Sequence, residues 1–255
     1  MIGEMFSKLN IPGIGTIINI ISVIVGGCLG LLLKKILSSK ITDTIMQGVG
    51  LAVLIVGLSG VFTSSVKVND SSLSFENTLL MILSLALGGL IGSLLRINER
   101  LEALSDKISR RFSTAHTKSF SEGFLAASLL FCVGAMAIIG SLEDGLNRNP
   151  GVLISKSALD FISAMIFAST WGAGVLLSSL SVAVYQGLIT LLAFLLAPLL
   201  SFEVISQMSL IGSVLIVGLS LDILKLTKEL KVANLLPAVF IPLVYDIIRS
   251  LILFI

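Results

Sequence analysis

Two stretches of this chain share one pattern of glycines: Ser22–Lys34 (SVIVGGCLGLLLK) and Ser84–Arg96 (SLALGGLIGSLLR). At a constant offset, both contain a serine, a glycine pair, a further glycine, two leucines and a terminal basic residue. Each stretch ends an apolar run and leads into a basic loop. The match predicts equivalent ends of two membrane-spanning helices in a repeated two-helix unit.

The composition supports a membrane location. Apolar residues make up 55% of the chain and charged residues only 13%, and the mean hydropathy is +1.07. Soluble domains contain about 25% charged residues. The apolar runs also reach the length of about 20 residues that a membrane span needs. We therefore expect an all-α fold, a polytopic integral membrane helix bundle with internal two-helix repeats.

The apolar runs predict about eight transmembrane helices. Ser157–Leu200 is too long for one span and carries one charge, Asp160, so we divide it at the SSLS of Ser178–Ser181. Residues 1–13 are interpreted as an N-terminal extension without the features of a cleaved signal peptide, and residues 14–255 as a single transmembrane domain. The helices are expected at about 15–33, 45–66, 77–96, 122–142, 157–177, 182–200, 205–224 and 233–255.

Three segments between the spans have distinct patterns. Ile97–Ser119 is charged, with apolar residues at near-helical spacing, and this predicts an amphipathic helix on the membrane surface. Lys67–Asn77 is polar and is expected to be a loop. Glu143–Gly151 (EDGLNRNPG) contains turn-forming residues and a proline, and is also expected to be a loop.

The charges predict an orientation. With eight spans, the loops after the first, third, fifth and seventh helices share one side and hold most of the seventeen basic residues. The positive-inside rule makes that side cytoplasmic and places both termini outside. Seven spans would move the lysines after the seventh predicted helix to the outside, so eight is preferred. The basic residues on this side are Lys34, Lys35, Lys40, Arg96, Arg100, Lys107, Arg110, Arg111, Lys118, Lys225, Lys228 and Lys231.

A second match is VLIVGLS, at Val53–Ser59 and again at Val214–Ser220. The two copies lie in spans that run in opposite directions, so a true relationship implies an inverted repeat, as in many secondary transporters. A chance match is the alternative, because apolar helices are built from few residue types.

The glycine stretches have two interpretations. Small residues four apart let helix backbones approach closely in lipid, so helix packing is the preferred role. The alternative is an unwound point that exposes carbonyl groups to an ion. The residues assigned to helix packing are Gly26, Gly27, Gly30, Gly88, Gly89 and Gly92.

Polar residues within apolar helices are costly and often functional. Ser169–Gly174 (STWGAG) joins small and polar residues to the single tryptophan, and predicts either a broken helix lining a cavity or dense packing. For the polar candidates, structural hydrogen bonding is the alternative to substrate contact. The substrate-path candidates are Asn19, Ser22, Ser84, Asp160, Ser169, Thr170, Gly172, Gly174 and Gln186.

The sequence contains no recognisable catalytic set, metal-ligand spacing or nucleotide fingerprint. We therefore expect no enzyme activity, cofactor or metal, and no catalytic residues. The basic loops reflect topology and attraction to anionic lipid, and nucleic-acid binding has no support. The expected partners are the lipid bilayer, a small solute or ion, and a second copy in a homodimer built on small-residue faces.

Six segments carry a resemblance to a known family: Gly15–Lys34, Met46–Gly60, Cys132–Leu146, Lys156–Phe161, Tyr185–Ala193 and Ala233–Ala238. On these segments the chain resembles the bacterial membrane-protein family catalogued as domain of unknown function 554. The resemblance implies a bacterial inner-membrane protein described as a candidate transporter, and it supplies no functional residues. The chain departs from the family pattern at Ala135, Ala137 and Phe161, where Pro, Thr and Gly are common, and in its ending YDIIRSLILFI.

Two functional hypotheses follow. The first is a secondary transporter or channel for a small solute or ion, with the substrate-path candidates along its path. The second is a non-transporting membrane scaffold or regulatory protein that acts through the basic cytoplasmic segment Ile97–Ser119. The repeats favour the first hypothesis, because many transporters bind substrate where repeats meet.

Overall fold

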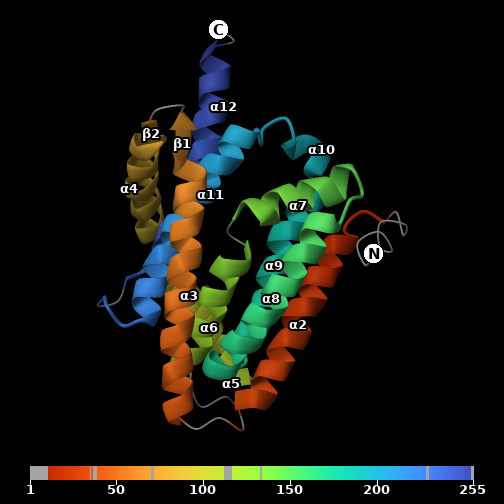
Figure 1. The fold of residues 1–255 in the computed structure, drawn as a ribbon, viewed down its shortest axis with the longest axis vertical. Helices are drawn as coiled ribbons and strands as arrows, with labels where there is room; N and C mark the ends of the chain where they lie inside the picture. Colours follow the sequence, from red (N-terminus) through yellow and green to blue (C-terminus); the bar gives the residue numbers. More distant parts are fainter. Residues whose placement is uncertain are drawn as a thin grey trace. The chain divides into compact units, whose positions relative to one another are not determined.

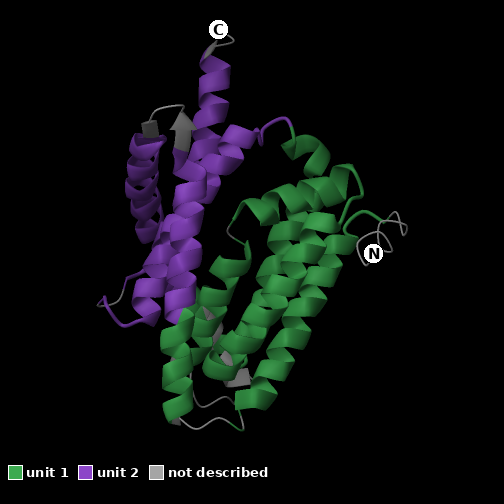
Figure 2. Ribbon diagram, in the orientation of Figure 1, with its two compact units in different colours: residues 1–49, 101–197 green, residues 50–100, 198–255 purple. Residues whose placement is uncertain are grey.

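The computed structural model describes residues 11–34, 36, 39–69, 72–111, 117–132, 134–227 and 230–253, and Figure 1 shows that they are mainly helical. They form two compact units, shown in Figure 2: residues 1–49 with 101–197, and residues 50–100 with 198–255. The single transmembrane domain expected from the sequence stays a prediction, and each unit is described by itself. Most of the predicted N-terminal extension lies outside the described residues.

The first unit is built mainly from helices of the N-terminal and middle parts of the chain. Its elements are α2 (Ile14–Lys34), the start of α3 (Ser39–Ser65), most of α5 (Ile97–Arg111), α6 (Thr117–Cys132), α7 (Ala135–Leu146), α8 (Gly151–Trp171), α9 (Gly174–Leu191) and the short α10 (Ala193–Leu196).

The second unit contains the rest of α3 and the C-terminal helices. Its other elements are β1 (Val66–Asn69), β2 (Ser72–Phe75), α4 (Thr78–Leu94), α11 (Phe202–Ile223), the 3-10 helix η1 (Val232–Phe240) and α12 (Ile241–Leu253).

The helices confirm the predicted polytopic membrane bundle. Six helical segments of the described chain are long and apolar enough to cross a membrane by themselves. Two bent pairs raise the number to eight: α4 with Ile97–Ala103, bent by 50°, and Ser119–Cys132 with α7, bent by 60°. The predicted number of spans agrees with the upper value.

In the first unit, the glycines of α2 let its backbone touch that of α8. A Cβ atom on Gly26 would lie 2.3 Å from the carbonyl oxygen of Phe161, and one on Gly30 would lie 2.2 Å from that of Met165. Further along, Lys34 Nζ donates to the carbonyl oxygen of Thr170 at 2.9 Å. The two helices therefore run parallel, in a contact that requires small residues.

In the second unit, the matching glycines of α4 face a different kind of partner. A Cβ atom on Gly88 would lie 2.3 Å from the backbone nitrogen of Ala238, and one on Gly92 would lie 1.9 Å from the carbonyl oxygen of Asn234. These contacts run antiparallel along η1. The same sequence pattern thus gives close backbone contact in both units, but against a parallel α-helix in one and an antiparallel 3-10 helix in the other.

The two VLIVGLS segments also lie within the second unit, on α3 and α11. A Cβ atom on Gly57 would lie 2.8 Å from the backbone nitrogen of Val217, and one on Gly60 would lie 2.2 Å from Ser213 Oγ. Residue numbers rise on one helix as they fall on the other, so the copies pack antiparallel. An inverted repeat requires the two copies to run in opposite directions, as they do here. That the two segments form an inverted repeat remains an interpretation.

The predicted division at Ser178–Ser181 is wrong. The turn lies at Gly172, whose φ of +85° suits glycine, and α9 begins at Gly174. The serines stay helical because their hydroxyls bond to the preceding turn: Ser178 Oγ donates to Val175 O at 2.6 Å and Ser179 Oγ to Leu176 O at 2.7 Å.

More predicted boundaries differ from the structure: the helix expected at 45–66 begins at Ser39, and the one expected at 182–200 ends at Leu191. The helix expected at 122–142 is divided near Gly134, with φ of +136°, and Glu143–Leu146 is helical because α7 extends to Leu146. The helix expected from 157 begins at Gly151, six residues earlier than the sequence indicated. After the break near Gly134 the chain continues as α7. The polar sequence Glu143–Gly145 therefore belongs to a helix instead of a loop.

Further differences concern the second unit. Lys67–Asn77, expected to be a loop, contains the antiparallel hairpin that pairs Val66 with Phe75 and Val68 with Leu73. The helix expected at 233–255 begins as η1, with Pro237 inside it. Proline has no N–H to donate, so Pro237 leaves one helical hydrogen bond of η1 unmade.

Replacing Gly26 with alanine is expected to destabilise the protein by about 1–3 kcal/mol, because the added methyl group would overlap the Phe161 carbonyl. The matched control is Gly187→Ala, since a Cβ atom there meets nothing within 4 Å. Unfolding in detergent, followed by circular dichroism, measures both variants. Equal stability of the two variants would contradict the backbone contact.

Candidate functional site

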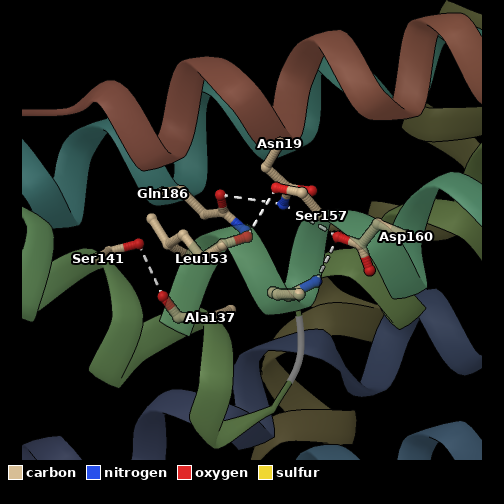
Figure 3. Close-up of polar contacts among 8 residues, drawn as sticks. Asn19, Ala137, Ser141, Leu153, Ser157, Asp160 and Gln186 are labelled. Atoms are coloured by element: carbon tan, nitrogen blue, oxygen red, sulfur yellow. Dashed lines mark hydrogen bonds and ion pairs between the residues drawn. The ribbon is translucent and has the colours of Figure 1, made fainter. Parts of the chain in front are cut away.

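Three residues that the sequence named as polar candidates meet inside the first unit, as Figure 3 shows. Asn19 on α2 donates from Nδ2 to Asp160 Oδ2 on α8 at 3.0 Å and to Gln186 Oε1 on α9 at 3.2 Å. Asn19 and Gln186 are 0% exposed and Asp160 is 5% exposed. The packing of α2 on both α8 and α9 therefore places an amide, a carboxylate and a second amide at one buried point.

A buried lysine completes this group. Lys156 lies four residues before Asp160 on α8, and its ammonium donates to Asp160 Oδ2 in an ion pair whose side chains are both 7% exposed. Lys156 Nζ also lies 5.8 Å from the centre of the Phe131 ring on α6, within cation–π range. We name Asn19, Lys156, Asp160 and Gln186 the polar cluster.

The sequence interpretation missed Lys156 because it began the helix at the next residue. The available signal was the spacing: a lysine and an aspartate four apart lie on the same face of a helix. That signal requires the helix to begin before Lys156, and α8 begins at Gly151.

Two buried atoms of the polar cluster have no hydrogen-bond partner within the described part of the chain: Asn19 Oδ1 and Gln186 Nε2. Buried polar atoms in folded proteins nearly always have a partner, because losing water without one costs about 1–3 kcal/mol. The cluster therefore offers one acceptor and one donor to a small polar occupant such as water, an ion or a solute.

A second buried carboxylate fixes the start of α2. Asp144 Oδ2 on α7 accepts from the backbone N–H groups of Gly15 at 3.0 Å and Thr16 at 3.2 Å. These N–H groups belong to the first turn of α2, where a helix has unpaired donors and favours negative charge. The sequence interpretation placed Asp144 in a loop and so missed this role.

The bend between α6 and α7 lies beside the polar cluster. Phe131, which faces the Lys156 ammonium, is one residue from the end of α6. On the far side of the bend, a Cβ atom on Gly140 would lie 2.8 Å from Leu153 Cδ2 on α8. A discontinuous helix therefore packs against the helix that carries the buried ion pair.

The other residues named from the sequence lie elsewhere. Ser22 is half-buried on α2, and Ser84 is fully buried on α4 in the second unit. Ser169 and Thr170 bond through their hydroxyls to Ile166 O, at 2.7 and 3.3 Å.

Ser169–Gly174 does not break a span at mid-depth, as one interpretation of the sequence proposed. Helices α8 and α9 are each long enough to cross by themselves, and Gly172 lies in the turn between them. Gly174 packs on α6, where a Cβ atom would lie 1.9 Å from the carbonyl oxygen of Phe120. This stretch therefore ends one helix and begins the next. Within the described ranges, no three His, Cys, Asp or Glu residues are grouped so that they could hold a metal ion.

Six to eight described helical spans that are long and apolar enough to cross a bilayer define a multi-span integral membrane protein. The chain belongs to the family described as Protein of unknown function (DUF554), which it matches over residues 14–247. It is 32% identical over 228 residues to "Uncharacterized membrane protein YdfK" of Bacillus subtilis (strain 168), covering 89% of this chain and 93% of that protein. It is 31% identical over 232 residues to "Uncharacterized protein YqgA" of Escherichia coli (strain K12), covering 89% and 94%. No solved structure matches.

Replacing one partner of the buried ion pair is expected to destabilise the fold strongly. Asp160→Asn or Lys156→Met alone leaves a buried charge without its partner, which costs about 3–5 kcal/mol. The double variant removes both charges and is expected to regain most of that loss. The wild type, the two single variants and the double variant form a double-mutant cycle. Their unfolding is followed by the fluorescence of Trp171, the single tryptophan.

The control for this cycle is Lys40→Met, because Lys40 is exposed. A sum of the two single effects in the double variant would mean that Lys156 and Asp160 do not interact in the folded protein.

Proposed function

We propose that the chain is a secondary transporter or channel for a small solute or ion, and that its path passes through the polar cluster. The observation that carries this proposal is the buried Lys156–Asp160 pair beside two unpartnered amide atoms. Charged groups inside a membrane bundle are costly and mark substrate and proton pathways in many transporters. A purely structural role would be served as well by apolar residues of similar volume.

The surrounding architecture supports the same proposal. Transporters commonly form their sites from discontinuous helices near the membrane midplane, where backbone groups become free to contact an ion. The α6–α7 bend of 60° lies beside Lys156 through its Phe131 contact. The glycines of α2 pack on the backbone of α8 next to Asp160, at Phe161, and hold the two helices closely together there.

We also propose a bacterial inner-membrane location with both termini outside. The two compared relatives come from bacteria, and the basic loops favour this orientation. The parallel course of α2 and α8 agrees with the predicted number of spans between them: the Lys34–Thr170 hydrogen bond joins their C-terminal ends, as the first and fifth spans require.

Flux measurements in proteoliposomes test the transport proposal. Purified protein is expected to carry at least one member of a panel of alkali cations, halides and amino acids. Asp160→Asn is expected to lower that flux at least about tenfold, because the carboxylate would no longer offset charge in the path. The matched control is Asp43→Asn, an exposed aspartate on α3 in the same unit.

Reconstituted protein that carries none of these solutes would count against transport. Undiminished flux in Asp160→Asn would remove the polar cluster from the path.

A further inference from the structure

Asp144 is a buried carboxylate whose charge is only partly compensated by the described residues around it. The residue is 0% exposed, and its Oδ2 accepts from the first N–H groups of α2. The ion pairs of the described chain join other residues, and Asp144 Oδ1 has no hydrogen-bond partner among them. A helix N-terminus carries only about half a positive charge. Because a buried charge without full compensation is costly, we expect the remaining oxygen to face a positively charged partner.

Two threonines from other helices meet α7 at this carboxylate. Thr190 on α9 donates from Oγ1 to Ser141 O at 3.3 Å, and a Cβ atom on Gly145 would lie 2.5 Å from the Thr190 carbonyl oxygen. Ser141 and Gly145 flank Asp144 within one turn of α7. Thr16 on α2 donates its N–H to Asp144 Oδ2 at 3.2 Å, and its Oγ1 lies 3.2 Å from Thr190 Oγ1. We name Asp144, Thr16 and Thr190 the Asp144 junction.

The hydroxyl hydrogens at the junction are directed away from Asp144 Oδ1. Thr190 donates to Ser141 O, so Thr16 is the donor in the bond between the two threonines. A hydroxyl has one hydrogen, and neither threonine can also donate to the carboxylate. The neighbouring Ser141 Oγ donates to Ala137 O at 2.7 Å, as Figure 3 shows. The junction therefore offers an occupant only lone pairs, and this favours a cation.

The chemistry and charge of these oxygens fit a monovalent hard cation. Carboxylate, hydroxyl and carbonyl oxygens are the ligands that hard cations prefer. Thr190 lies in the last turn of α9, where the helix dipole is negative and also favours a cation. A single carboxylate, already partly balanced by the start of α2, leaves less than one negative charge to neutralise. A divalent ion would leave the apolar bundle with excess positive charge.

Close packing restricts the junction to a small ion. A Cβ atom on Gly15 would lie 3.0 Å from Asp144 Oδ2, and one on Gly145 would lie 2.5 Å from the Thr190 carbonyl oxygen. A larger molecule would have to separate α7 from α2 or α9. The way in from the surface is short, because Leu146 and Asn147 are exposed and follow Asp144 within one turn.

We infer that the Asp144 junction binds one small monovalent cation, of the size of Na⁺ or Li⁺. The inference goes beyond the proposed function, because binding here does not require that the chain transports a solute. The junction lies near the polar cluster: Thr16 is one turn before Asn19 on α2, and Thr190 is one turn after Gln186 on α9. A bound cation would join α7 to the two helices that carry these amides.

Calorimetric titration of the intact protein in detergent tests the inference, with Na⁺, Li⁺ and K⁺ chlorides as probes and choline chloride holding the ionic strength constant. We expect saturable binding of one cation per chain, tighter for Na⁺ or Li⁺ than for K⁺. The unfolding temperature is expected to rise with the concentration of the cation that binds, because a ligand of the folded state stabilises it. Absence of saturable binding for all three cations would overturn the inference without any variant.

Asp144→Asn removes the charge but keeps a side-chain oxygen that can accept from the backbone of Gly15 and Thr16. This variant is expected to fold and to lose cation binding. The matched control is Asp43→Asn, an exposed aspartate in the same unit, which is expected to bind like the wild type.

A second set of variants tests the hydroxyl ligand independently. Thr190→Val is expected to weaken binding at least about tenfold, the scale on which lost partners weaken metal sites. Thr190→Ser keeps the hydroxyl and is expected to retain binding. Ser178→Ala removes another buried hydroxyl of α9 and is the control. Undiminished binding in either Asp144→Asn or Thr190→Val, with circular dichroism showing a folded protein, would contradict the site.

The outcomes separate this inference from the transport proposal. Solute flux without saturable cation binding removes the cation site and leaves transport standing. Cation binding that Asp144→Asn abolishes, in a protein that carries no solute in proteoliposomes, supports the site and removes transport.

Discussion

The backbone contact between α2 and α8 is the constraint on which the first unit depends. In lipid, helices gain little from hiding apolar surface from one another, so their association relies on close packing and on hydrogen bonds between them. Gly26 and Gly30 allow the backbone of α2 to touch carbonyl groups of α8. That approach sets the register of the two helices, and the register brings Asn19 within hydrogen-bond distance of Asp160.

The polar cluster depends on this register. A one-residue shift of α2 would turn Asn19 away from Asp160 and leave a buried carboxylate with one fewer donor. The same shift would remove the Asp144 carboxylate from the first-turn N–H groups of α2. Packing and hydrogen bonding therefore specify one arrangement together, since each buried polar group carries a cost that only this alignment offsets.

Several helix boundaries expected from hydropathy were wrong because a local backbone or side-chain interaction decided where the helix began or ended. The serines of Ser178–Ser181 resembled a loop, yet their hydroxyls can bond to their own helix, while Gly172 adopts the conformation that ends α8. Asp144 was expected in a loop because turn-forming residues and a proline surround it, and Lys156 was left outside a predicted helix that began at the next residue. The burial of Asp144 depends on α2, a partner distant in sequence. The burial of Lys156 depends on α8 beginning at Gly151, a start that hydropathy does not indicate.

The sequence by itself determined the class of protein: long apolar segments with few charges can only be satisfied as helices in a bilayer. It also determined that Asn19, Asp160 and Gln186 lie inside apolar helices, because their neighbours are apolar, and that the repeated glycines offer close-packing faces. Only the tertiary structure decided that these three residues meet. It also decided that Lys156 pairs with Asp160, and that equivalent glycines face a parallel α-helix in one unit and an antiparallel 3-10 helix in the other. The reason is physical: a repeating apolar pattern gives a helix and its small-residue face, whereas the partner of that face depends on which helix reaches it at contact distance.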